Sequence, residues 1–428
     1  MNKKVLALLS MGHAATDINQ GALPMMLAFL QPVLALSQLQ IGAVMLAFNL
    51  SSSVIQPVFG ILSDRFSAAY LIPIGCLLAG LGMAFTGYAP NYPLLLLIAL
   101  ASGLGVAAYH PEGSKFSRFA SGPRKASGMS LFSVGGNFGF AAGPALATLF
   151  VGLAGLSGSL GFLALNGVMA LVLWFYLRAI TSLSPGTAEF PAPAGARPEA
   201  ANAGKPEAGK PGAEKLEAGN PGAERRAAGK LAVGRVVVPV VLLVLVIIMR
   251  TWVHLGIVTF LPQYYVHYLH HSETYAATLT SLFLLAGAFG TLVGGPAADR
   301  WGLKTIIVAS MAAMVPLLFL FGQARGFWVP VVVVLAGFTV VSTFSVTVVL
   351  GQELLPNNVG LASGLTLGFA IGTGGIGATL LGWIGDHWGL PAIFHTMIIF
   401  PVIGLMLALF LPGQEEISER KAATASSS

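Results

Sequence analysis

Acidic and basic side chains interrupt the long apolar runs of this sequence, and those in the first run have a spacing that suits proton chemistry. His13 and Asp17 are four residues apart, and Gln20 follows three residues later. In a helix, residues four apart share one face, so the spacing predicts a histidine–carboxylate pair. Because both groups can gain or lose a proton when their surroundings change, we interpret them as candidate proton-coupling residues. The alternatives are a hydrogen bond between helices for His13 and a structural ion pair with Arg250 for Asp17.

A second set of ionisable residues lies further along the first half, where His110 and Glu112 flank Pro111 and Lys115 follows. Ionisable groups inside a bilayer are costly, so each is a functional hypothesis, and we interpret His110 and Glu112 as further proton-coupling candidates. Lys115 offers a positive point charge to an anionic substrate. Alternatively, Glu112 lies near the cytoplasmic water and pairs with Lys115 or Arg118.

A third set lies in the second half of the chain, where Arg250 and His254 are again four residues apart. The planar guanidinium of Arg250 can hold a carboxylate or phosphonate group through two parallel hydrogen bonds. We therefore predict that Arg250 and His254 bind the substrate, together with Lys115, Gln20 and Asn137. The neutral polar side chains could instead form hydrogen bonds between helices.

The sequence contains no recognisable set of catalytic residues. It has no phosphate-binding Walker loop, and no Ser-His-Asp or zinc-ligand spacing stands out in or near the apolar runs. His267, His270 and His271 resemble a metal-binding patch by number, but we interpret them as a solvated cluster at the membrane interface. The sequence therefore predicts a protein that is not an enzyme and that uses no cofactor and no metal.

The elements that must position these residues are membrane helices. Of the 428 residues, 55% are hydrophobic and 9% are charged, whereas about 25% of the residues in soluble proteins are charged. A helical span needs about 20 apolar residues, and runs of that kind recur throughout the chain. We predict an all-α polytopic membrane protein with twelve transmembrane helices. The predicted spans are near residues 5–34, 40–62, 69–88, 93–117, 126–151, 157–179, 234–266, 275–297, 304–323, 327–352, 360–384 and 391–412.

Residues 181–232 differ from the rest in being rich in Ala, Gly, Pro, Glu and Lys. Such a composition cannot bury enough apolar area to offset the entropy of ordering, so we predict a disordered cytoplasmic linker. It separates an N-terminal six-helix bundle (1–180) from a C-terminal six-helix bundle (233–412), and residues 413–428 form a cytoplasmic tail. Lys and Arg gather on the linker side of the predicted spans, which places both termini in the cytoplasm. This distribution accounts for the net charge of +6 without a nucleic-acid partner.

Two motifs recur at nearly the same offset. A G-x3-D-R motif at Asp64 and Arg65 recurs at Asp299 and Arg300, an offset of 299 − 64 = 235 residues. The stretch SGMSLFSVGGNFG, which begins at residue 127, resembles SGLTLGFAIGTGG, which begins at residue 363, an offset of 363 − 127 = 236. The offsets predict two six-helix pseudo-repeats. We expect the paired Asp-Arg motifs to act as gates, by capping a helix N-terminus or pairing with a cytoplasmic arginine. A simple loop turn is the alternative.

The loops FGILSDRFS and GGPAADRWGLK resemble the motif G-x3-D-[R/K]-x-G-x-[R/K]-[R/K] of the major facilitator superfamily, although the first has Ser67 where the motif has glycine. More narrowly, GHAATDINQGALP, YHPEGSKFSRFASG and SVGGNFG resemble the fosmidomycin resistance protein family. The first resemblance implies the major facilitator fold, with all three sets of ionisable residues around one pathway. The second implies a proton-driven efflux pump of the inner or plasma membrane, with a small phosphonate antibiotic among its substrates.

We therefore predict a secondary transporter, specifically a proton-coupled antiporter that exports a small polar or anionic compound. Its expected partners are the substrate, protons and the lipid bilayer, and the chain is expected to be a monomer. A proton symporter or a facilitated importer of a small metabolite would have the same fold, because no motif sets the direction of transport. A third alternative is a receptor that binds without transport, but residues 181–230 do not resemble a folded signalling domain.

Overall fold

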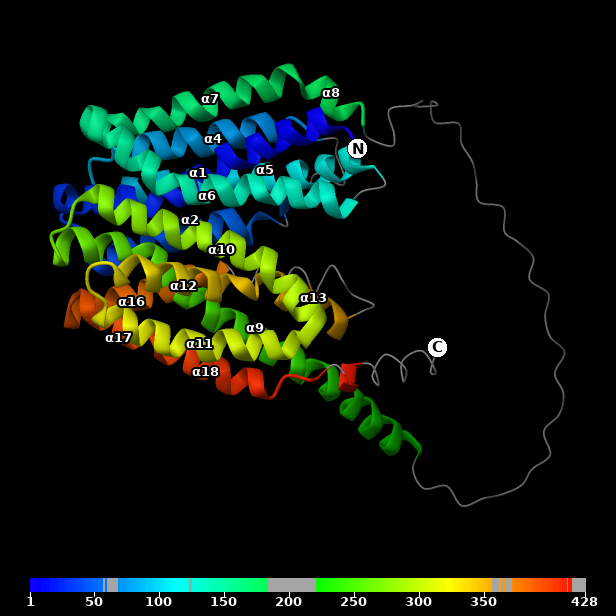
Figure 1. The fold of residues 1–428 in the computed structure, drawn as a ribbon. Coiled ribbons are helices and arrows are strands. Elements are labelled where there is room, and N and C mark those ends of the chain that lie inside the picture. Colours follow the sequence, from blue (N-terminus) through cyan, green and yellow to red (C-terminus); the bar gives the residue numbers. More distant parts are fainter. Residues whose placement is uncertain are drawn as a thin grey trace, which may run out of the picture.

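The computed structural model of the chain describes residues 1–56, 58–59, 68–122, 125–183, 221–355, 362, 365–366, 372–413 and 415–417. Within these ranges the regular elements are all helical (Figure 1). A helix satisfies its backbone hydrogen bonds within one segment, which is what a bilayer requires of a spanning chain. Seven helical stretches among these residues are long and apolar enough to cross a membrane. The number twelve stays a prediction.

The helices of the first half pack mainly against one another. Helix α1 lies along α6, and α4 packs against both α5 and α7. The chain reverses between α6 and α7 in the short helix η2, where Gly155 has a φ of +61°. The elements are α1 (Lys3–Leu34), α2 (Gln38–Asn49), η1 (Leu50–Val54), α4 (Leu71–Thr86), α5 (Tyr92–Ser121), α6 (Lys125–Ala154), η2 (Gly155–Ser159), α7 (Leu160–Phe175) and α8 (Leu177–Thr181).

The helices of the second half form a similar group, in which α10 packs against α12, and α18 packs against α9 and α11. The elements are α9 (Pro221–Gln263), η3 (Tyr264–Tyr268), α10 (Glu273–Trp301), α11 (Leu303–Gln323), α12 (Trp328–Ser342), α13 (Phe344–Leu354), α16 (Gly374–Trp388), α17 (Leu390–Met397) and α18 (Ile399–Leu409).

Helix α9 begins earlier than the sequence predicted. Its first residue is Pro221, so residues 221–232 of the predicted linker are helical. The Ala, Glu, Arg, Lys and Leu residues of this segment favour a helix, which outweighs its few glycines. Residues 184–220 of the predicted linker lie outside the described residues.

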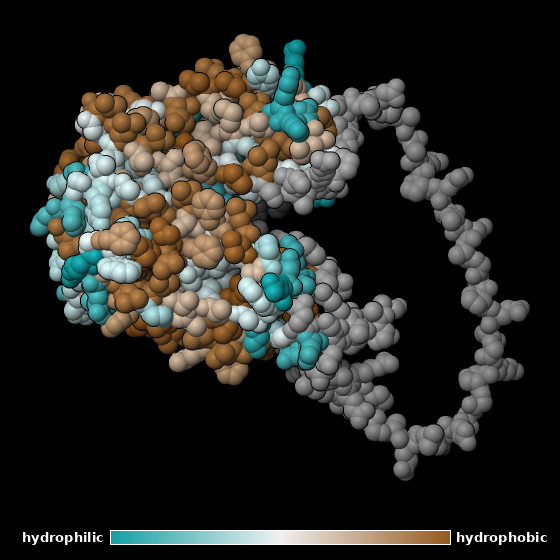
Figure 2. All heavy atoms as spheres, in the orientation of Figure 1, coloured by the Kyte–Doolittle hydropathy of each residue, from teal (hydrophilic) through white to brown (hydrophobic). Residues whose placement is uncertain are grey.

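The two groups of helices meet along two main seams, α2 against α16 and α6 against α10. The first seam is close, because a Cβ atom added at Gly42 of α2 would lie 2.7 Å from the Cα of Thr379 in α16. Viewed from the side, the start of α1 and the end of α18 lie at the same end of the molecule (Figure 1). Figure 2 shows hydrophobic residues over the flank and hydrophilic residues gathered towards the two ends, as a bilayer requires.

Candidate functional site

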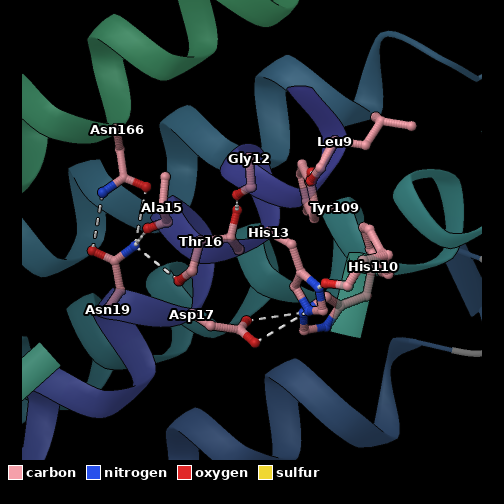
Figure 3. Close-up of polar contacts among 11 residues, drawn as sticks. Leu9, Gly12, His13, Ala15, Thr16, Asp17, Asn19, Tyr109, His110 and Asn166 are labelled. Carbon is pink, nitrogen blue, oxygen red and sulfur yellow. Dashed lines mark hydrogen bonds and ion pairs between the residues drawn. The ribbon is translucent and has the colours of Figure 1, made fainter. Parts of the chain in front are cut away.

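Two predicted histidines, from two different helices, converge on the carboxylate of Asp17 (Figure 3). In α1, the Nε2 atom of His13 lies 3.2 Å from Oδ2 of Asp17. From α5, the Nε2 atom of His110 lies 3.0 Å from Oδ1 of the same carboxylate. The two imidazole rings contact each other edge to face, with centroids 4.9 Å apart. The structure therefore joins the first two sets of residues into a single group, here called the His–Asp–His cluster.

Helix α6 fixes the ring of His13 on its other side. The ring of Phe132 stacks on that imidazole with centroids 4.1 Å apart. The backbone carbonyl of Phe132 lies 2.8 Å from Nδ1 of His13. Gly136 follows one turn later, and a Cβ atom there would lie 2.7 Å from Oδ2 of Asp17. Neither Phe132 nor Gly136 was predicted as a site residue; the double glycine in SVGGNFG was the available signal.

Two further contacts hold α1 in place beside the cluster. The hydroxyl of Tyr109 donates a hydrogen bond of 2.6 Å to the carbonyl of Leu9, which ties α5 to α1. On the far side, the amide of Asn19 donates a hydrogen bond of 3.1 Å to Asn166 of α7. Both contacts are buried, so they should be strong in these surroundings. They fix α1 against two neighbours and so limit how far the cluster can move.

The geometry of His13 determines where a proton must lie. A carbonyl oxygen only accepts hydrogen bonds, so Nδ1 of His13 carries the hydrogen that Phe132 accepts. A neutral ring would then present the lone pair of Nε2 to the carboxylate of Asp17, 3.2 Å away. A proton between Nε2 and Oδ2 removes this repulsion, either as an imidazolium–carboxylate pair or as a neutral pair. The cluster can therefore hold one proton that His13 and Asp17 share.

The same three side chains also have a spacing that a metal ion could use. Their candidate ligand atoms all lie within 4.8 Å of one another. By contrast, His267 makes a different contact, because its Nε2 donates a hydrogen bond of 2.8 Å to the carbonyl of Ala28. Its neighbours His270 and His271 are exposed. A divalent cation bound at the cluster is therefore the alternative to a shared proton, and experiments on proton coupling must distinguish the two.

Glu112 lies outside the cluster although it is two residues from His110. Two residues correspond to about 200° around a helix, so the two side chains leave α5 on different sides. Glu112 is 1% exposed, and its carboxylate lies 3.7 Å from Nζ of Lys115. The structure thus forms the Glu112–Lys115 pair that the sequence left open as an alternative.

Arg250 is buried and His254 is half-buried in α9, and neither makes an ion pair with the cluster among the described residues. Nη1 of Arg250 and Nε2 of His254 have no hydrogen-bond partner among the described residues. The guanidinium lies over the ring of Phe344, 5.5 Å from its centroid, while the imidazole lies between Phe140 and Phe283. Because a buried cation is unfavourable without an anion, this arrangement suits the binding of an anionic group.

The alternative role for Asp17, an ion pair with Arg250, does not occur in the described part of the chain. The carboxylate of Asp17 instead faces His13 and His110. Each of its two oxygens already lies within hydrogen-bond distance of an imidazole, so the carboxylate is held within the first half.

The remaining predicted residues are not brought together. Gln20 is half-buried and Asn137 is exposed on α6. Asp299 and Arg300 are exposed at the end of α10, where Arg300 lies over the ring of Trp301 at 5.6 Å. Among the described residues, neither of these two forms the ion pair expected of a gate. Their counterparts Asp64 and Arg65 lie outside the described residues.

Comparison with known proteins identifies the family. The sequence matches the Major Facilitator Superfamily over residues 9–278 and 240–427. The chain belongs to this superfamily. This major facilitator is 32% identical over 408 residues to the fosmidomycin resistance protein of Escherichia coli (strain K12), which covers 95% of this chain and 92% of that protein. It is 31% identical over 420 residues to the uncharacterized MFS-type transporter YfnC of Bacillus subtilis (strain 168), covering 97% and 94% of the two chains.

Solved structures of major facilitators share the fold. One is a bacterial homolog to the human lysosomal transporter Spinster, with a TM-score of 0.71, 15% identity and coverage of 96% of both chains. Another is a D-xylose-proton symporter, with a TM-score of 0.65, 15% identity and coverage of 96% of this chain and 97% of that one. The all-α, polytopic major facilitator fold is thus confirmed. This major facilitator is a multi-pass membrane transporter of small molecules and not an enzyme, as the sequence predicted.

Proposed function

We propose that this transporter is a proton-coupled antiporter that exports a small polar or anionic compound. The observation that carries the proposal is the His–Asp–His cluster, in which Nε2 of His13 lies 3.2 Å from Oδ2 of Asp17, so that the two side chains can share one proton. Ionisable groups in such surroundings are costly and are retained where they serve transport. The name of the Escherichia coli relative, a fosmidomycin resistance protein, supports efflux as the direction.

Loss of the shared proton would change how the His13 and Asp17 side chains are arranged, and this would link protonation of the cluster to the conformation of the helices. Without it, the negative carboxylate of Asp17 faces the lone pair of Nε2 of His13 at 3.2 Å. The repulsion raises the energy of this arrangement and favours one in which the side chains separate. Because the carbonyl of Phe132 in α6 binds the other side of the His13 ring, such a separation would change the position of α1 relative to α6. This supports the cluster, rather than Glu112, as the coupling site.

The substrate class follows from Arg250. A buried guanidinium without a partner anion among the described residues can offer parallel N–H donors to a carboxylate, phosphate or phosphonate group. His254, one turn along α9, adds a second nitrogen atom that has no hydrogen-bond partner among the described residues. Lys115, Gln20 and Asn137 remain proposed substrate contacts at other points of the pathway. The proton site and the anion site then lie in different halves, so that movement of the halves can couple the two.

The topology is part of the same proposal. Two six-helix halves, joined by a cytoplasmic linker and with both termini in the cytoplasm, would rock about a central site. The gathering of Lys and Arg on one side supports this orientation. We propose that a monomer in the inner or plasma membrane is the working unit.

The test is to follow internal pH in proteoliposomes while fosmidomycin is added outside. We expect substrate-triggered proton movement that is lost in Asp17→Asn and kept in Glu273→Gln, which removes an exposed acid at the start of α10. Full exchange by Asp17→Asn would contradict the role of the cluster. Protons and substrate moving in the same direction would indicate a symporter, binding without flux would indicate a receptor, and substrate flux that requires zinc instead of a pH gradient would indicate a metal site.

A further inference from the structure

One acidic residue that lies outside the proposed site joins the two halves of the molecule. Asp386 is near the end of α16, and its Oδ1 accepts a hydrogen bond of 2.6 Å from the backbone N–H of Gln38. Its Oδ2 accepts a second hydrogen bond of 2.9 Å from the N–H of Leu39. Gln38 and Leu39 are the first two residues of α2, and they precede Asp386 by about 350 residues. The two helices belong to opposite halves.

The carboxylate completes the capping of α2. The side chain of Ser37 accepts a hydrogen bond from the N–H of Gln40, and the side chain of Gln40 accepts one from the N–H of Ser37. This capping box does not use the N–H groups of the first two helical residues, Gln38 and Leu39. Both of these groups donate hydrogen bonds to the carboxylate of Asp386. A negative charge at this position also interacts favourably with the helix dipole. A side chain from one half therefore supplies the missing cap of a helix in the other half.

A second contact joins the halves at the same end of the molecule. His267, in the short helix η3 that follows α9, donates a hydrogen bond of 2.8 Å to the carbonyl of Ala28 in α1. Between these contacts and the middle of the bundle, α2 and α16 pack so closely that Gly382 lies against the backbone of Gln38. Among the described residues, two hydrogen-bonded contacts and the α2–α16 seam thus join the halves at the end of the molecule opposite the start of α1.

We propose that Asp386 is the latch of the gate at this end, and that His267 is a secondary contact of the same gate. Separating the halves here requires α2 to leave α16, which breaks both Asp386 bonds together. The carboxylate and the N–H groups would then be hydrated, so the joint can open reversibly. The inference rests on the transporter fold alone and does not depend on the substrate or on proton coupling.

The test measures how often the α2–α16 seam opens. The sequence has a single cysteine, Cys76, so Cys76→Ala gives a background without cysteines. Ala378→Cys then places a reporter that is 0% exposed beside Gly42 in the seam. In lipid nanodiscs, where both faces are accessible, the rate of modification by a hydrophilic maleimide follows the fraction of open molecules. No substrate is needed for this readout.

Asp386 is exposed, so we expect Asp386→Ala to raise the modification rate about 2- to 5-fold, the range that corresponds to losing an anion from a solvent-exposed helix N-terminus. Asp386→Asn keeps an acceptor but loses the charge, so it should give a smaller increase. Combining His267→Phe with either Asp386 variant should raise the modification rate further. The matched control is Glu273→Gln, which removes an acid from the first turn of α10 at the same end of the molecule.

An unchanged modification rate in Asp386→Ala, or an equal increase in Glu273→Gln, would contradict the proposal that Asp386 holds the gate closed. Variants are compared only if their thermal unfolding resembles that of the parent, and Asp386→Asn serves if the alanine variant does not fold. A failed transport assay with a positive labelling result would leave the latch intact and reject only the proposed substrate or proton coupling.

Discussion

Gly136 is the position at which a single methyl group should uncouple the proton site. In Gly136→Ala, the added Cβ would lie 2.5 Å from Nε2 of His13 and 2.7 Å from Oδ2 of Asp17. Both distances are well below the ordinary contact distance of about 3.5–4.0 Å between heavy atoms. Because α1 and α6 are packed along their length, the helices have little room to separate. The side chains of His13 and Asp17 must therefore move away from the added methyl group, and we expect this to disturb the contact between them.

The magnitude follows from the bond that is lost. A hydrogen bond that involves a charged group contributes about 1.5–3 kcal/mol. At about 1.4 kcal/mol for each factor of ten, its loss should reduce proton-coupled transport roughly 10- to 150-fold. Overpacking a helix contact also costs about 1–3 kcal/mol of stability, so the thermal unfolding of the variant must be measured beside its activity.

The assay is substrate-triggered proton movement in proteoliposomes over a range of pH, with two control variants in α6. In Gly139→Ala, the added Cβ would lie 2.7 Å from the Cα of Ala14, and its three nearest atoms all belong to the backbone of Ala14, so the variant overpacks the same pair of helices at a different residue. In Gly152→Ala, the added Cβ would meet no atom within 4 Å. We expect a changed pH dependence in Gly136→Ala only.

Two results would refute this reasoning. If Gly136→Ala moves protons at the parental rate and with the parental pH dependence, then His13 and Asp17 do not need their present contact. If Gly139→Ala loses as much transport as Gly136→Ala, then the helix packing, and not the position of the proton, is what transport requires.

Further outcomes follow from the remaining polar groups. Asp17→Asn should abolish proton movement and leave the fold intact, because both imidazoles keep an oxygen or nitrogen neighbour; circular dichroism and flux measured on one preparation check this. Arg250→Gln should raise the concentration of an anionic substrate needed for half-maximal transport about 10- to 150-fold, since a charge-assisted hydrogen bond is lost; an unchanged value would place the anion elsewhere. Lys115→Ala should destabilise the protein more than Glu112→Gln, by roughly 1–3 kcal/mol, because it leaves the buried carboxylate of Glu112 without its nearest cation; thermal unfolding in detergent would show equal shifts if the pair were unimportant.

Much of the architecture could be predicted because a bilayer restricts what a spanning chain can do. Long apolar runs predict helices, and the recurrence of the Asp64 and Asp299 motifs predicts a duplication. Local pairs are equally accessible to sequence reasoning. His13 and Asp17 are four residues apart, so any helix places them on one face, and the structure places them 3.2 Å apart.

Contacts between helices depended on packing that spacing does not encode. His110 joins Asp17 across 93 residues, whereas Glu112, two residues further on, turns to Lys115. The prediction placed His110 and Glu112 in one role because their rotation about α5 relative to α1 was unknown. The carbonyl of Phe132 decides where the proton of His13 lies. It is a backbone group, so its role cannot be recognised from the type of residue in the sequence.

The sequence by itself determined the membrane class and the transporter family, because hydrophobic length, charge and short motifs are properties of local composition. It also supplied the ionisable residues that we propose for the pathway. Tertiary structure alone decided which of those residues meet. It separated the buried Arg250 from Asp17 and brought Asp386 to the first turn of α2. The physical reason is that hydrogen bonds and ion pairs act over a few ångströms, and distances between distant segments are set by how the helices pack.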